Sequence, residues 1–223
     1  MSAKANITIT EVQGGTIVHL NFATQKQLAL TMSRPQEFYE SNLDQFRGQV
    51  FTWAEFVEQF TTDDGEFKRL KDWSGYNIPG DVLDQFFELF DLSQCEAELA
   101  RTVAQVRGHS YYVIGTSDST PGVIDHELVH AHYYLNSQYR DQANTLVSQM
   151  DPVVFGDLAQ LLSEWGYDQS VMVDEVNAYM STTPQEYVSD KMKIQIPQKH
   201  MEPFIELASK VLDTKQHRGT QHD

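Results

Sequence analysis

Two histidines and a glutamate stand close together in the second half of the chain, in the segment VIDHELVHAHYYLN. His126 and His130 are four residues apart, and Glu127 directly follows the first of them. On an α-helix, residues four apart lie one turn apart on nearly the same side, so the two imidazoles can bind one metal ion. Glu127 points about 100° away from His126, where it can take a proton from a water without being a ligand. The spacing H-E-x-x-H therefore predicts a zinc site with Glu127 as general base.

The residues around this motif suit a helix in the interior of a fold. Leu128, Ala131 and Leu135 would lie on one apolar side of it. His132 points well away from both motif histidines, so we expect a surface or second-contact histidine there and no ligand. The alternative interpretation is a helix with two core or surface histidines that bind no metal.

The positions that follow the motif separate the known classes of H-E-x-x-H protein. The metzincin pattern would need glycine and histidine where this chain has Tyr133 and Asn136. Peptide deformylases carry an upstream cysteine ligand, but Cys95 lies in the helical pattern DLSQCEAEL, without their glycine-containing motif. The segment from about Ser110 to Tyr179 instead resembles the gluzincin branch of zinc metallopeptidases.

The resemblance implies a third metal ligand on a later helix. In gluzincins a glutamate completes the site, and here the segment VDEVNAYM in the predicted helix Gln169 to Met180 offers Glu175. Asp174 and Glu164 are its rivals. Asp174 has a shorter side chain that points elsewhere on the helix, and Glu164 lies near the end of the preceding helix.

One position departs from the gluzincin pattern. The ligand glutamate of that family is typically followed four residues later by an aspartate that orients the first histidine. Tyr179 stands there in this chain, so Asp125 and Asp174 are considered as substitutes.

A phenol or an imidazole is also expected to stabilise the negative charge that develops on the substrate. Tyr179 is the favoured residue for this catalytic role. The sequence leaves open four further candidates, which are His109, Tyr111, Tyr133 and Tyr134.

The segment HSYYVIGT, from His109 to Thr116, is β-branched and aromatic and predicts a strand just ahead of the motif. Zincins commonly have an edge strand at this place, and an extended peptide adds to it by backbone hydrogen bonds. Tyr111, Tyr112 and Val113 are therefore expected to bind substrate.

The elements before this strand predict an α+β fold with a small N-terminal sheet and a mainly helical remainder. Two alternating segments, NITITEV and TIVHLNF, flank Gly14-Gly15 and predict a hairpin. The run LALTM, from Leu28 to Met32, could add a third strand. An aromatic-rich helical region follows, in which aromatic side chains at helical spacing predict plain core, and DWSGYNIPG predicts a loop that could cover a cleft.

We expect a single α+β domain over residues 1–215, with room for two lobes. Residues 1–108 would hold the hairpin and the aromatic-rich helices, and residues 109–215 would hold the metal site. Residues 216–223 are polar and are expected to form a flexible tail.

Composition limits the classes of partner. Lys and Arg total 16 against 32 Asp and Glu, which gives a net charge of -16 and disfavours binding to nucleic acid or anionic membranes. No apolar run is long enough to span a membrane, and no signal peptide is visible, so a cytoplasmic location is expected. Signal-independent secretion would leave no mark, and the sequence carries no indication of oligomeric state.

Together these patterns predict a zinc-dependent metallopeptidase that hydrolyses a peptide or protein substrate through a zinc-bound water, with Glu127 as general base. One alternative is a non-catalytic binding or regulatory protein on a degenerate zincin scaffold. Another is hydrolysis of a non-peptide amide at the same site.

Overall fold

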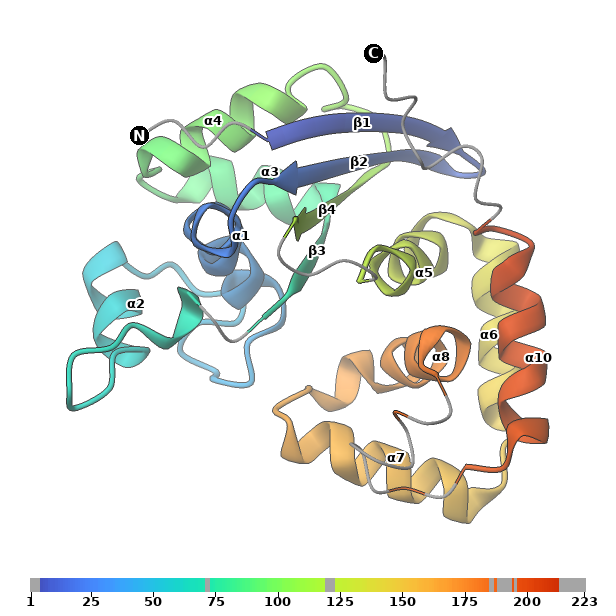
Figure 1. The fold of residues 1–223 in the computed structure, drawn as a ribbon. Coiled ribbons are helices and arrows are strands. Elements are labelled where there is room, and N and C mark those ends of the chain that lie inside the picture. The colour runs from blue at the N-terminus through green and yellow to red at the C-terminus, as the bar shows by residue number, and fades with distance from the viewer. Residues whose placement is uncertain are drawn as a thin grey trace. The chain divides into compact units, whose positions relative to one another are not determined.

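A computed structural model of the chain describes residues 5–70, 73–118, 123–184, 187, 194 and 196–212 (Figure 1). The chain divides into two compact units, Met1–Ile124 and Asp125–Asp223. The tail expected at residues 216–223 lies outside the described part. Among the described helices, none is both long and apolar enough to cross a membrane.

The first unit is built on a four-stranded sheet (Figure 1). The predicted hairpin is confirmed as β1 (Ala5–Val12) and β2 (Gly15–Phe22), and Gly14 takes a positive φ of 95° in the turn between them. The other strands are β3 (Gly75–Pro79) and β4 (Tyr111–Ser117). The strand order is β1-β2-β4-β3, with β4 parallel to β2 and antiparallel to β3.

Four helices accompany this sheet: α1 (Gln25–Glu40), α2 (Trp53–Gln59), α3 (Gly80–Leu89) and α4 (Gln94–Val103), with a short 3-10 turn η1 (Lys68–Leu70). Side chains from α1, α3 and α4 form one core with residues of β2, β3 and β4. A second cluster joins the phenylalanines of the aromatic-rich region, so the prediction of plain core there is confirmed. Capping boxes at Thr52 and Ser93 begin α2 and α4.

Two expected elements of this unit are wrong. The run Leu28 to Met32 lies inside α1. Thr24 caps the start of this helix, and Leu28 and Met32 are buried on one of its faces. A short apolar run is compatible with a strand or with a helix, and here the N-cap at Thr24 indicates the helix. The expected loop DWSGYNIPG contains β3, in which Tyr76 and Ile78 alternate into the core and Pro79 ends an edge strand.

The expected edge strand is also wrong, although a strand does precede the motif. β4 is bonded to β2 over its whole length and to β3 from Tyr112 to Thr116. Its backbone donors and acceptors on both sides therefore belong to the sheet, and the edges of the sheet are β1 and β3. Because β4 is part of this sheet, it lies in the first unit, whereas the lobe boundary expected at residue 108 would have put it in the second.

The second unit, as far as it is described, is helical (Figure 1). It contains α5 (Ile124–Leu135), α6 (Ser137–Ser148), α7 (Pro152–Glu164), the 3-10 turn η2 (Gln169–Val171), α8 (Met172–Thr182) and α10 (Gln198–Ser209). One core joins α7, α8 and α10, and another joins α5, α6, α8 and α10. A mixed sheet followed by these helices confirms the α+β class.

Candidate metal centre

Helix α5 presents both histidines of the motif to one point. Their Nε2 atoms are 3.2 Å apart, and the two rings meet edge to face with centroids 4.8 Å apart. His130 is 2% exposed, and its neighbours Leu128, Val129 and Ala131 on this helix are also buried. Burial on this helix restricts the side chain of His130 to a fixed position, which is what a binding site needs.

Helix α8 brings Glu175 to the same point. Its Oε1 lies 3.6 Å from Nε2 of His130, and its Oε2 lies 3.9 Å from Nε2 of His126. Ligand atoms of the three side chains all lie within 4.8 Å of one another, and Glu175 is only 3% exposed. The three predicted ligands therefore converge.

His130 is oriented by a carboxylate. Its Nδ1 lies 2.9 Å from Oδ2 of Asp174, so the Nδ1–H donates to Asp174 and Nε2 faces Glu175. Burial disfavours the charged imidazole, but Asp174 and Glu175 outweigh burial and raise the pKa of His130 well above its usual value. Asp174 thus binds Nδ1 of His130, away from the point where Glu175 meets both Nε2 atoms, and it orients the second histidine where the first was expected.

His126 is oriented by a hydroxyl that sequence analysis missed. Oγ1 of Thr182 donates to the carbonyl of Ala178 at 2.7 Å and lies 3.2 Å from Nδ1 of His126. A hydroxyl has one proton to give, so Thr182 accepts from the Nδ1–H of His126, and Nε2 keeps its lone pair. The spacing could have identified Thr182, because it follows Glu175 by seven residues on the same helix and therefore lies within about 20° of the same face.

The protonation of the pair follows from these partners. Burial and the nearby His130 lower the pKa of His126 well below its usual value. Two Nε2 atoms at 3.2 Å need one proton between them when no cation is bound, and His130 is the more basic ring. A divalent cation would compete with that single proton for two nitrogen lone pairs and a carboxylate, a donor set that zinc prefers.

Glu127 lies one residue beyond His126 and is buried. Its charge is close enough to act on three groups of the centre, because it contributes to the raised pKa values of His130, Tyr167 and Tyr179. The carboxylate predicted as general base is therefore near enough to these groups to influence their charge.

Tyr179 lies against the first histidine. Its ring meets the ring of His126 edge-on with centroids 4.8 Å apart, and its hydroxyl lies 3.2 Å from that of Tyr167. Burial raises the pKa of both phenols, and Glu175 raises each further, so both keep their protons at neutral pH. Tyr167 was missed because it lies in the turn between α7 and η2, where no helical spacing relates it to the motif.

The remaining candidates lie elsewhere or are engaged. Glu164 is exposed and accepts a hydrogen bond from Gln160, and Asp125 is exposed. His132 is buried, and its ring contacts Tyr139, so the expected surface position is wrong. In the first unit, Cys95 packs on the hydrophobic core, Tyr111 donates to Asp84, and His109 is exposed. On α5, Tyr133 donates to Asn144.

The residues expected to bind substrate do not offer a free strand. Tyr111, Tyr112 and Val113 have buried side chains, and the backbone of Tyr112 and Val113 is paired on both sides. Addition of a peptide strand to β4 is therefore excluded, because the inner position of β4 leaves no unpaired edge.

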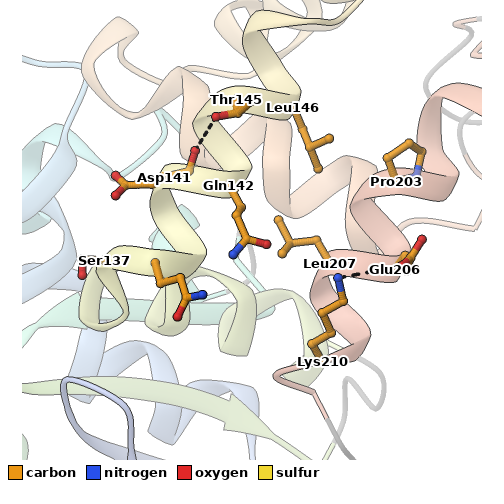
Figure 2. A pocket seen from close by; sticks show the side chains of 10 residues that line it. Ser137, Asp141, Gln142, Thr145, Leu146, Pro203, Glu206, Leu207 and Lys210 are labelled. Carbon is orange, nitrogen blue, oxygen red and sulfur yellow. Dashed lines mark hydrogen bonds and ion pairs between the residues drawn. The ribbon is translucent and has the colours of Figure 1, made fainter.

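A hollow in the second unit is separate from the ligands. It measures about 590 Å³ and lies between α6 and α10, with Gln142, Leu146 and Leu207 among its lining residues (Figure 2). Figure 2 shows Thr145 bonded to the carbonyl of Asp141 and Lys210 paired with Glu206, each within its own helix. None of the three ligands lines this hollow.

Comparisons of the chain with known protein families, with curated proteins and with solved structures found no match.

Proposed function

We propose that this protein is a zinc-dependent metallopeptidase in which His126, His130 and Glu175 hold the metal and Glu127 is the general base. The observation that carries the proposal is the convergence of two Nε2 atoms and a buried carboxylate, each ring being fixed through Nδ1 by a different partner. Convergence of this donor set with oriented imidazoles is what a catalytic zinc site requires.

A zinc ion bound by these residues would supply Lewis-acid activation of a carbonyl group and of a water molecule. Glu127 would accept the proton of the attacking water and deliver it to the leaving amine, since it lies beside the ligands without being one. The phenols of Tyr167 and Tyr179 stay protonated and would donate to the oxygen on which negative charge develops.

The alternative is a non-catalytic protein that binds a metal on a degenerate zincin scaffold. The inner position of β4 favours it, because the strand that would hold an extended peptide in a zincin has no free edge. The presence of Glu127 favours catalysis, because a purely structural zinc needs no adjacent general base.

Metal content and peptide hydrolysis test the proposal together. We expect one zinc per wild-type chain by elemental mass spectrometry, loss of zinc in Glu175→Ala, and full zinc content in the control Glu164→Ala. Glu127→Gln should keep its zinc and lose hydrolysis of a peptide library by about 100-fold to 10,000-fold. Failure of the wild type to take up zinc would refute the metal centre. Full zinc content with no difference between wild type and Glu127→Gln on peptides or small amides would favour the non-catalytic alternative.

A further inference from the structure

An aromatic wall lies beside the proposed metal ligands and is made of Trp165, Tyr167 and Tyr179. Tyr179 is its centre: it contacts His126, and the rings of Trp165 and Tyr167 contact Tyr179 with centroids 5.9 Å and 6.3 Å away. These contacts connect a metal ligand to the surface through aromatic rings.

The turn that carries two of these residues is rigid. Helix α7 ends in a Schellman motif, in which N–H of Tyr167 donates to the carbonyl of Leu162 at 3.1 Å and N–H of Gly166 donates to that of Ser163 at 3.0 Å. Gly166 has φ +99°, as this motif requires. Tyr167 also packs on the core cluster that contains Leu162. The turn therefore fixes the backbone that carries Trp165 and Tyr167, and both rings contact Tyr179.

The wall remains partly open to solvent. Trp165 is 45% exposed, while Tyr167 and Tyr179 are half-buried. A single exposed apolar side chain needs no explanation, but the indole of Trp165 contacts Tyr179, which contacts His126, so it extends from the proposed metal centre as a surface that a ligand can cover.

The chemistry of the wall favours an aromatic partner. The hydroxyls of Tyr167 and Tyr179 face each other at 3.2 Å. The wall presents ring surface, and ring surface is best covered by another ring in an offset or edge-on contact.

We propose that the aromatic wall is the specificity subsite of the metal centre and takes an aromatic side chain of the substrate next to the reacting carbonyl. This inference rests on the proposed function, because the metal is what would anchor the substrate beside Tyr179.

Metal-anchored probes test the subsite without turnover. Three hydroxamic acids share one zinc-binding group and differ in the attached side chain: acetohydroxamic acid, phenylacetohydroxamic acid and a guanidinium-bearing analogue. Their dissociation constants are measured by calorimetry on the zinc-loaded wild type, Trp165→Ala, Trp165→Phe and Val153→Ala. Val153 is the matched control, since it is an exposed apolar residue at the other end of α7.

We expect the phenyl probe to bind wild type about tenfold more tightly than acetohydroxamic acid, as a ring contact of this kind allows. The preference should fall to about twofold in Trp165→Ala, stay near the wild-type value in Trp165→Phe, and be unchanged in Val153→Ala. Thermal unfolding of each variant checks that the turn still folds.

Three results would overturn the inference while leaving the metal centre intact. They are an equal affinity of wild type for the phenyl and methyl probes, a full preference retained in Trp165→Ala, and tighter binding of the guanidinium probe than of the phenyl probe. If the wild type holds no zinc and binds none of the probes, the proposed function and the subsite fall together.

Discussion

The two histidines of the proposed metal centre are oriented by groups of different charge. Asp174 accepts from His130, and Thr182 accepts from His126 while it donates to Ala178. A carboxylate at the second place, as gluzincins typically have, would add negative charge to a centre that already buries Glu127 and Glu175. A hydroxyl fixes the tautomer of His126 without that cost in charge repulsion.

Thr182→Val should lower zinc affinity by about 10-fold to 100-fold, because it keeps the shape of the side chain and removes the acceptor for Nδ1–H. Thr182→Ser keeps the hydroxyl and should bind zinc nearly as tightly as wild type. Competition with a chromophoric chelator measures both affinities. A Thr182→Val protein with wild-type affinity would show that the 3.2 Å contact does not position the ring.

At the scale of elements, local signals sufficed for most of the helices. Asp151 and Pro152 begin α7, Thr52 and Ser93 form capping boxes, and α8 covers the helix predicted from Gln169 with a short 3-10 turn before it. Caps and helical periodicity depend on residues that are close in the sequence, so they can be recognised from the sequence alone. That His126, His130 and Glu175 lie close together could be predicted for the same reason, since they lie on two helices that the sequence indicates.

Pairing between distant segments could not be predicted in this way. Whether β4 is an inner or an edge strand depends on its pairing with β3. Gly75 and Pro79 make the β3 segment look like a loop in the sequence, and only the burial of Tyr76 and Ile78 in the core identifies it as a strand. The role of Tyr167 likewise depends on a turn that places it against Tyr179. Such contacts join residues whose spacing in the sequence follows neither the helical nor the strand period.

The turn after α7 allows a prediction at this scale. Gly166→Ala should destabilise the protein by about 1–2 kcal/mol, because φ +99° brings a side-chain Cβ against the backbone. Gly156→Ala is the control on the same helix: a Cβ there meets nothing within 4 Å, so it should stabilise by about 0.5–1 kcal/mol. Chemical denaturation measures both changes. Equal stability of the two variants would show that the positive φ of Gly166 carries no cost for a side chain.

For the whole molecule, charge and metal binding act on stability in opposite directions. The net charge of -16 opposes a compact state through repulsion among carboxylates. The metal centre adds to this in the second unit, where Asp174 is buried with its pKa raised by burial against the opposing effect of His130. A divalent cation at His126, His130 and Glu175 would relieve repulsion at the point where it is least screened by solvent.

Zinc should therefore stabilise the folded chain, by about 2.7 kcal/mol at a free concentration 100 times its dissociation constant. Hydrogen exchange should slow most in α5 and α8, which carry the ligands. Salt and magnesium also screen a charge of -16, so stabilisation alone does not identify the site. Glu175→Ala separates the two effects: it should keep the response to salt and lose the response to zinc. If zinc stabilises Glu175→Ala as much as wild type, the ion acts through general screening and the three residues are not its ligands.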